Sequence, residues 1–413
     1  MQKTVLHRAA ALTLGLTAAA CGITSDSGAG PGGAAAPATE AWIGAWGAPI
    51  TGSSAGPANA TVRNIVRPTI GGHRLRIRIS NAMDAATPLN IAAATVALVK
   101  EGAQIVPGST RVITFNGGSR SVWVPPSTDF VYSDGLDFPV QAQQDLAISL
   151  FLPDTTTPVG SGAAWSTSFV TADGGGDRTL EEDGASFAPI GGDQAPPETP
   201  LVCSGCSTYA LTAIDVMTDE ADGAVGAIGS STFHGNNSTR DSHRRVLDQL
   251  SVRVNAEVPR GRQKGIVSAG IGGDTLHAGL GRLARDVWSQ SGLKAVMVYD
   301  VNDLSSRTYQ EIRDDYLILI ADAHQRGVQV YCSTWPPAAQ SAPAKPTQER
   351  SKLNAWLLNS HACDRVVDWD AVLRSDIAPD EYRADYFSDG IHPNDAGHTA
   401  MAQAVPVLEW FGF

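Results

Sequence analysis

The sequence predicts an α/β protein in which a C-terminal three-layer α/β/α domain with a parallel sheet follows an all-β domain of the sandwich or jelly-roll type. Two patterns support this prediction. In residues 42–216, polar and apolar side chains alternate in short runs between turn residues, as in half-buried antiparallel strands. After Glu220, continuous apolar runs alternate with longer helical stretches, as in a parallel sheet covered on both faces.

Length and composition agree with two domains. The chain has 413 residues, more than one ordinary domain holds, and its 42 glycines and 24 prolines favour a loop-rich β component. We expect the β domain at residues 41–218 and the α/β domain at 219–413. A formal net charge of −12 argues against nucleic acid as a partner and gives no attraction to an anionic membrane surface.

Four runs in the first half are expected to be strands, at residues 74–79, 111–115, 121–124 and 145–151. In the first run, Arg74, Arg76 and Arg78 alternate with aliphatic side chains. These arginines could form a face that binds carbohydrate or phosphate. We expect instead that they form the solvated face of a half-buried strand.

Five apolar runs in the second half are expected to be parallel strands, at residues 225–228, 265–267, 295–299, 328–333 and 366–369. Five helices are expected between and after them, at residues 240–254, 276–289, 306–326, 348–360 and 394–409. Active sites of such sheets lie outside the carboxyl ends of the strands. We therefore expect the chemistry in the loops that follow these runs.

The first 21 residues resemble an export signal. Two basic residues precede an apolar stretch at 9–20 that is too short to span a membrane, and Cys21 follows three alanines. This resembles a bacterial lipoprotein signal in which Cys21 becomes the lipidated N-terminus, although Leu16 lies further back than the leucine of such signals. Residues 22–40, rich in small residues, are expected to be a flexible tether. We expect an exported protein, held on the outer face of the cell membrane by lipid or else secreted.

Four further cysteines remain in the chain. Cys203 and Cys206 are candidates for a local disulfide. Cys332 and Cys363 lie near predicted strands and could form a second disulfide. A Cys-x-x-Cys pair could also bind metal, but zinc requires further ligands at short spacing, and the sequence offers none near this pair. We therefore expect no metal site.

The most informative segment is residues 388–394, which read SDGIHPN. Asp389, three residues before His392, can hold the imidazole in one tautomer and stabilise it when it takes a proton. Such a pair serves a nucleophile. Residues 224–231, AVGAIGSS, form an apolar run that ends in serines, which is how a strand delivers a hydroxyl to the edge of a sheet.

Four blocks occur in order along the chain: GSS at 229–231, GIGGDT at 270–275, DVND at 300–303 and DGIH at 389–392. On these blocks the chain resembles the SGNH, or GDSL-type, esterase and lipase family over residues 223–405. The N-terminal half also resembles the β-rich domain that precedes the catalytic domain in some exported bacterial members. The resemblance implies a serine ester hydrolase that works through an acyl-enzyme without a metal or cofactor.

The resemblance also implies roles for single residues. Ser231 would be the nucleophile, because Gly229 and Gly235 then fall where the family's glycines fall. His392 would act as general base and then acid, and Asp389 would orient it.

The implied oxyanion donors are the backbone N–H groups of Ser231 and Gly273 and the side-chain amide of Asn302. His234, three residues past the nucleophile, and Trp335, followed by two prolines after a strand, are expected to line the pocket.

Two positions depart from the family's pattern and are also candidates for the pocket. Ser230 stands where the family has aspartate before the nucleophile, and Asp300 stands where its third block begins with glycine. One hypothesis is that a carboxylate lost from the first strand end reappears on a neighbouring one. The alternative is that Asp300 crowds the oxyanion site or places negative charge there, which would oppose catalysis. Asp303 is expected to cap the following helix.

The substrate class is the least defined property. Family members act on acetylated sugars, lipids, thioesters and small esters, and no lid-like apolar segment indicates long acyl chains. We expect short-chain or carbohydrate O-acyl esters, with lipid esters as the alternative. A catalytically weak glycan-binding lipoprotein of the cell envelope is the competing class. Trp46, Trp123, Trp165 and Trp335 could stack on sugars, with Trp46 and Trp123 expected in the core.

Overall fold

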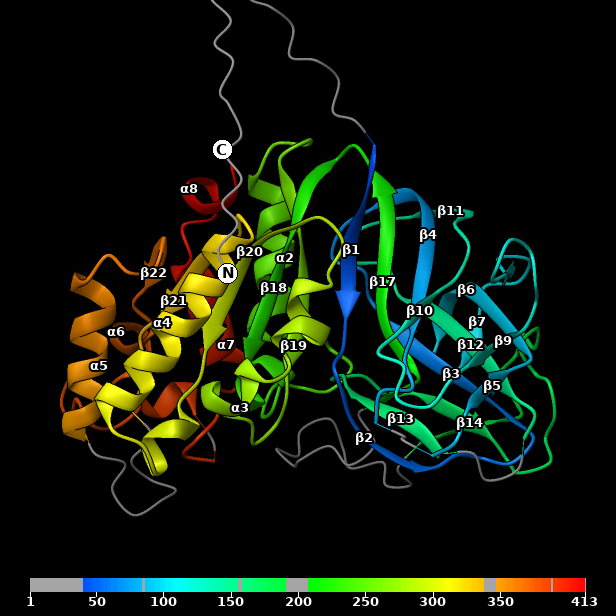
Figure 1. Ribbon diagram of the computed structural model, residues 1–413, viewed down its shortest axis with the longest axis horizontal. Coiled ribbons are helices and arrows are strands. Elements are labelled where there is room, and N and C mark those ends of the chain that lie inside the picture. The colour runs from blue at the N-terminus through cyan, green and yellow to red at the C-terminus, as the bar shows by residue number, and fades with distance from the viewer. Residues whose placement is uncertain are drawn as a thin grey trace, which may run out of the picture. The chain divides into compact units, whose positions relative to one another are not determined.

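The computed structural model of the protein is shown in Figure 1, and it describes residues 40–83, 86–154, 158–190, 207–337, 347–387 and 389–412. The predicted export signal and tether, with Cys21, lie outside the described residues, as do Cys203 and Cys206. In the described part of the chain, no helix is long and apolar enough to cross a membrane.

The first half of the chain is rich in antiparallel strands, as predicted. Two larger sheets, ordered β1-β17-β4-β10 and β15-β14-β3-β12-β6-β7, contribute to one hydrophobic core. The strands are β1 (Ala41–Gly47), β2 (Ile50–Ala55), β3 (Ala60–Val66), β4 (Gly72–Ile79), β5 (Leu89–Ile91), β6 (Ala93–Glu101), β7 (Gln104–Ile105), β8 (Arg111–Ile113), β9 (Val122–Val124), β10 (Val131–Tyr132), β11 (Leu136–Val140), β12 (Leu146–Leu152), β13 (Pro158–Ala163), β14 (Phe169–Thr171), β15 (Phe187–Pro189), β16 (Ser207–Tyr209) and β17 (Leu211–Thr218).

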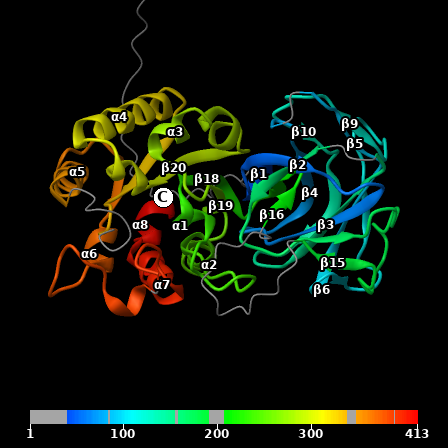
Figure 2. The same cartoon turned by 90° about the horizontal axis from the view of Figure 1, so that it is seen from below.

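The second half contains a parallel sheet ordered β19-β18-β20-β21-β22. Its strands are β18 (Ala221–Gly229), β19 (Gln263–Gly270), β20 (Leu293–Tyr299), β21 (Gln329–Ser333) and β22 (Arg365–Val367). All five are among the predicted runs, because each is a short apolar segment bounded by polar or glycine residues. In the view of Figure 2, helices α3 and α4 lie above strand β20, and α2 and α7 lie below β18.

The helices of the second half are α1 (Ser231–His234), α2 (Val246–Glu257), α3 (Leu276–Leu280), η1 (Ala284–Trp288), η2 (Asn302–Ser305), α4 (Tyr309–Gln325), α5 (Thr347–Asn359), α6 (Trp369–Leu373), η3 (Ala384–Tyr386), α7 (Asp395–Ala404) and α8 (Val407–Phe411). Two predicted helices are interrupted. The stretch 276–289 divides into α3 and the π-helical turn η1 around glycines, and 394–409 divides at Pro406, which lacks the N–H that would continue α7. Helix α2 begins six residues later than predicted, at Val246 instead of Arg240.

Residues 38–413 form one compact unit, and the two halves share hydrophobic core. Val267 of β19 belongs to the core cluster of the β-rich half. The backbones also approach closely, since the Gly44 N–H donates to the Ser291 carbonyl at 2.9 Å, and a Cβ on Gly265 would lie 1.9 Å from the Gly44 oxygen. The predicted boundary at 218/219 therefore falls in a turn between two packed halves.

The arginines of β4 contribute to this junction, which corrects the expectation of a solvated face. Arg76 donates to Asp215 at 2.9 Å and to Ser291 at 3.0 Å. Arg78 is 3% exposed and donates to the Ser289 hydroxyl at 2.9 Å. Both guanidinium groups are thus used to attach the β-rich half to the segment after η1, and only Arg74 lies near the surface, against Asp137.

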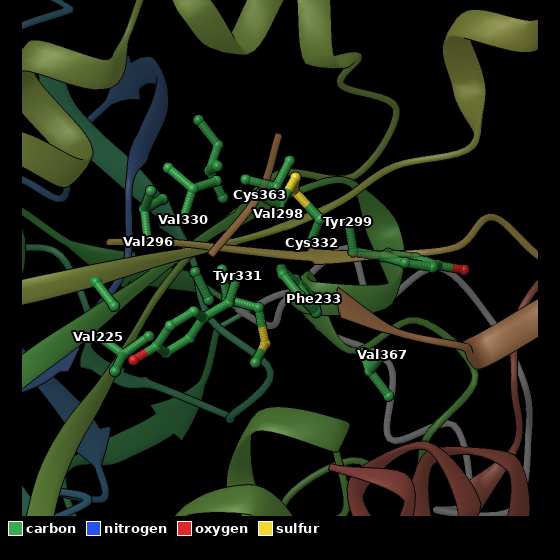
Figure 3. Close-up of a cluster of buried hydrophobic side chains, with 14 of the residues drawn as sticks. Val225, Phe233, Val296, Val298, Tyr299, Val330, Tyr331, Cys332, Cys363 and Val367 are labelled. Carbon is green, nitrogen blue, oxygen red and sulfur yellow. A yellow bond between two sulfur atoms is a disulfide. The ribbon is translucent and has the colours of Figure 1, made fainter. Parts of the chain in front are cut away.

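A disulfide joins Cys332 of β21 to Cys363, just before β22. From the sequence this bridge was one possibility. Figure 3 shows this bond near Val298 of β20 and near Val330, which lies on the same strand as Cys332. On the same sheet, the Phe233 ring packs 5.6 Å from that of Tyr299, which anchors α1 over the end of β20.

Candidate active site

The candidate nucleophile stands where a strand turns into a helix. Strand β18 ends at Gly229, and α1 begins at Ser231. Gly229 is required at this turn, because a Cβ there would lie 2.2 Å from the Tyr299 carbonyl oxygen. The tight turn sets Ser231 just after the carboxyl end of β18, an inner strand of the sheet, where it is 8% exposed.

Ser231, His392 and Asp389 form one hydrogen-bonded chain. The Ser231 Oγ lies 2.8 Å from His392 Nε2, and His392 Nδ1 lies 2.6 Å from Asp389 Oδ2. With the Nδ1 proton donated to the carboxylate, Nε2 is left as the acceptor for the serine hydroxyl. The arrangement can remove the serine proton and stabilise the resulting imidazolium.

Asp389 is ordered by the chain next to it. Its Oδ1 accepts the N–H groups of Ile391 at 2.9 Å and His392 at 2.8 Å. Burial by itself would raise the pKa of Asp389, but the hydrogen bonds from His392 and Ile391 outweigh it and lower the pKa below its ordinary value. Asp389 is therefore ionised wherever the imidazole needs an anionic partner.

The second and third blocks meet beside the nucleophile. The Ile271 N–H donates to the Gly229 carbonyl at 3.0 Å, which joins the second block to the first. Gly273 adopts φ +79°, and a Cβ there would meet nothing within 4 Å, so its backbone faces open space. The Asn302 Nδ2 donates one hydrogen to the Asp274 carbonyl at 2.7 Å. Among the described contacts the second amide hydrogen of Asn302 has no acceptor, as its predicted role of oxyanion donor requires.

Asp300 is a buried carboxyl group at the end of β20, with 1% exposure. Burial, together with the neighbouring Asp303, raises the pKa of Asp300 to about 8, against the lowering effect of the Asn302 N–H. At pH 7 the group is therefore mostly neutral, which removes the basis for the hypothesis of a fixed negative charge at the oxyanion site.

Ser230 and Asp300 directly follow Gly229 and Tyr299, which are paired in neighbouring strands. The Ser230 hydroxyl is buried without a hydrogen-bond partner among the described residues, and the hypothesis that the carboxylate moved from one strand end to the other stays a prediction. A different expectation is revised. Asp303 does not cap α4, because Thr308 does so, and it accepts the Leu276 N–H at the start of α3.

Of the two residues expected to line the pocket, His234 lies near the proposed site and Trp335 is buried in the core. His234 lies beside the second block, since a Cβ on Gly272 would lie 3.4 Å from His234 Nδ1, and its ring meets Trp165 edge-on at 5.4 Å. Burial lowers the pKa of His234 to about 4. Trp335 does not line a pocket: it is 0% exposed, with its indole N–H bonded to the Tyr316 hydroxyl. The two prolines after Trp335 predict an exposed loop, but burial of the large apolar indole in the core is more favourable.

The other tryptophans also differ from expectation in part. Trp46 is buried, as predicted, and Trp165 is buried with its N–H donated to the Ser238 carbonyl at 3.0 Å. Trp123 is 59% exposed, because it occupies the outward face of the short strand β9 between buried Val122 and Val124.

Two residues that position the site carried no recognisable signal in the sequence. Asn237 donates its side-chain amide to the His392 carbonyl at 2.8 Å and so holds the histidine loop from the nucleophile's own segment. Arg282 binds Asp274 at 2.6 Å and donates to the Ala269 carbonyl, which fixes the second block. Asn237 lies 155 positions from its partner, so no local spacing could reveal it.

Residues 227–400 match the GDSL-like Lipase/Acylhydrolase family. Among solved structures, the chain is similar to the lipase/acylhydrolase from Enterococcus faecalis, with 20% identity and a TM-score of 0.36, over 45% of this chain and 94% of that one. It is also similar to a GDSL-like lipase from Bacteroides thetaiotaomicron (17% identity, TM-score 0.35, 44% and 84%) and to the acetyl xylan esterase AlAXEase (19%, 0.36, 44% and 96%). No curated protein matches the chain. The matched segment contains all four blocks.

Proposed function

We propose that the chain, a carboxylic ester hydrolase with a GDSL-like lipase/acylhydrolase domain at residues 227–400, cleaves short-chain or carbohydrate O-acyl esters through an acyl-enzyme. The observation that supports this mechanism is the chain of hydrogen bonds from Ser231 through His392 to Asp389. An activated hydroxyl and an oriented base are the two groups that acyl transfer needs.

In the proposed mechanism, the Ser231 Oγ attacks the ester carbonyl carbon while His392 Nε2 takes its proton. The carbonyl oxygen becomes an oxyanion, which accepts hydrogen bonds from the Ser231 and Gly273 N–H groups and the Asn302 amide. His392 then gives its proton to the leaving alcohol. Water, deprotonated by His392, attacks the acyl-serine, and the acid leaves as Ser231 regains its proton.

The preference for short-chain or carbohydrate esters rests on the sequence, in which no lid-like apolar segment indicates long acyl chains.

A comparison of two adjacent serines tests the catalytic proposal. Ser231→Ala should lower the rate of acid release from p-nitrophenyl acetate roughly 10⁵-fold. Ser230→Ala is the matched control, since its buried hydroxyl makes no hydrogen bond in the described structure, and it should keep most of the activity. Equal rates for wild type and Ser231→Ala would leave a non-catalytic glycan binder as the better description.

The substrate class needs its own experiment. Acid release from acetyl, butyryl and octanoyl esters should fall as the acyl chain lengthens, and acetylated polysaccharides should be cleaved. A rate that rises towards octanoate would instead support lipid esters, the alternative substrate.

We also propose a three-layer α/β/α arrangement for residues 219–413 and a sandwich for residues 41–218. The contacts of α2 with α7 and α8, and of α4 with α3 and α5, support two helical layers.

Export and lipid attachment are proposed from the sequence of residues 1–21 alone. Cys21→Ser should move the protein from the membrane fraction to the medium, while an unchanged distribution would argue against a lipid anchor.

A further inference from the structure

Asp300 and Asp303 form a pair of buried carboxyl groups that the proposed mechanism does not use. Asp300 is 1% exposed and Asp303 is 0% exposed, and the two side chains share a hydrogen bond. Burial of two carboxyl groups side by side is costly unless their contacts compensate for it. The contacts they make therefore indicate what the pair is for.

The Asp300 carboxyl group connects two loops. Its Oδ1 accepts the N–H of Val301 at 2.6 Å and of Asn302 at 3.0 Å, and its Oδ2 accepts the N–H of Leu276 at 2.5 Å. Asn302 carries one proposed oxyanion donor, and Leu276 directly follows the block that contains Gly273. The carboxyl group thus bonds to both loops that carry oxyanion donors outside the nucleophile's own segment.

Asp303 completes the same junction. Its Oδ2 accepts the Leu276 N–H at 2.7 Å, so both carboxyl groups converge on the first residue of α3. On the open side of the junction, the Asn302 amide donates to the Asp274 carbonyl at 2.7 Å. The orientation of the Asn302 side chain therefore depends on the distance between the two loops.

The charge state of the pair follows from its neighbours. Asp303 faces Arg307, with Nε 3.5 Å from its Oδ1, whereas the other titratable groups near Asp300 are Tyr299 and Tyr316, whose pKa values burial raises further above their ordinary range. Burial raises the pKa of both carboxyl groups and Arg307 opposes this for Asp303, so Asp300 is the group that holds a proton at neutral pH and donates it to Asp303. Arg307 also pairs with Asp315, which in turn pairs with His277.

We propose that Asp300 is a positioning residue of the oxyanion hole, which fixes the Gly273 loop and the Asn302 side chain relative to each other. This inference rests on the proposed hydrolase function. Loss of the Asp300 proton to solvent would remove its hydrogen bond to Asp303 and place a second negative charge behind Asn302. Both effects oppose the formation of an oxyanion, so the ionised form is the less active one.

The test compares two variants of Asp300. Asp300→Asn stays neutral at every pH, can donate to Asp303 and still accepts the Asn302 N–H, while the Leu276 N–H keeps Asp303 as its acceptor. Asp300→Ala removes all of these bonds. Acid release from a short-chain ester gives kcat and KM between pH 6 and 10, with thermal unfolding recorded at each pH. The matched control is Asp370→Asn, another buried carboxyl group with a raised pKa, on α6.

Asp300→Ala should lower kcat about 100-fold at pH 7 with KM changed less than about threefold. Asp300→Asn should stay within about threefold of wild type at pH 7. Above pH 8 the wild-type kcat should fall as Asp300 ionises, so that at pH 9 Asp300→Asn is about tenfold faster than wild type. Asp370→Asn should keep the wild-type alkaline decline.

A folded Asp300→Asn variant that is as slow as Asp300→Ala, or that declines at high pH like wild type, would overturn the inference. Failure of the function itself is seen separately: if Ser231→Ala kept the wild-type rate, the hydrolase proposal would fall. If Ser231→Ala is inactive but the pH profile of Asp300→Asn is unchanged, only the role of Asp300 is wrong.

Discussion

The two sides of the site are built differently. On one side, Ser231, His392 and Asp389 bond to one another through side chains, and the His392 and Asp389 side chains are 15% and 29% exposed. On the other side, Asp300 and Asp303 are fully buried and bond mainly to backbone N–H groups. Groups that exchange protons with substrate must reach the surface, whereas groups that fix loops work best where water is excluded.

The largest effect is expected from the base on the exposed side. His392→Ala should lower kcat roughly 10⁵-fold, because no other group lies within hydrogen-bond reach of the Ser231 hydroxyl among the described contacts. Steady-state acid release gives the rate, and Ser231→Ala/His392→Ala is the control. The double variant should be little slower than either single one, and additive losses would show that the two residues do not act as a unit.

Asp389→Asn should cost about 10⁴-fold in kcat. The amide can hold the backbone N–H groups of Ile391 and His392 but cannot stabilise a protonated imidazole. The loop geometry should therefore survive while the chemistry is lost, and unchanged thermal unfolding would separate the two. A variant with near wild-type kcat would contradict the assignment of Asp389 as the partner of His392.

On the buried side, Asn302→Ala should lower kcat about 10²- to 10³-fold with little change in KM, since it removes one oxyanion donor. The same substitution breaks the bond to the Asp274 carbonyl. Asn302→Asp separates the effect of side-chain size from that of charge, because aspartate has the size of asparagine but its negative charge repels an oxyanion. If it were as active as wild type, Asn302 would not face the oxyanion.

The disulfide takes no part in the proposed chemistry, and we expect it to affect stability alone. Replacing Cys332 and Cys363 together with serine should lower the free energy of unfolding by about 2 to 4 kcal/mol, given the 31-residue separation of the bridge. Urea unfolding measures the loss. A large fall in kcat at temperatures where the variant is folded would show that the bridge also shapes the site.

The smallest expected effect is on the pH dependence of stability and comes from His398, a histidine that is buried, unlike His392. His398 is 0% exposed, its Nδ1 accepts the Val246 N–H, and burial lowers its pKa to about 4. The contribution of neutral His398 to the stability of the folded state is complete above the unfolded pKa of about 6.5 and is lost as pH falls towards 4, by at most roughly 1.4 kcal/mol per pH unit. Replacement by glutamine should flatten this slope between pH 6.5 and 4.5, measured by urea unfolding. An unchanged slope would place the acid sensitivity in other groups.

Local sequence predicted one side of the site better than the other. Asp389 and His392 lie three residues apart in a loop whose own N–H groups order the carboxylate, so their pairing is visible in the sequence. The parallel strands were predicted for a similar reason, since each is a continuous apolar run. Helix ends were less certain, because glycines and Pro406 interrupt otherwise helical stretches.

Contacts between distant residues were not predictable in the same way. The contact of Asp300 with Leu276 spans 24 positions and depends on which strands are neighbours in the sheet. The two prolines after Trp335 predict a pocket residue, yet packing against Tyr316 buries it. Arg76 and Arg78 alternate like solvated residues, yet the second half of the chain covers them.

The sequence by itself determined the order of strands and helices, the four blocks and the pairing of Asp389 with His392, because these depend on residues close together in the chain. The tertiary structure decided which groups are removed from water. The sequence allows Asp300 to place a negative charge at the oxyanion hole, whereas burial between two loops makes it a neutral group that bonds to both loops. Its charge depends on desolvation, which only the packed structure imposes.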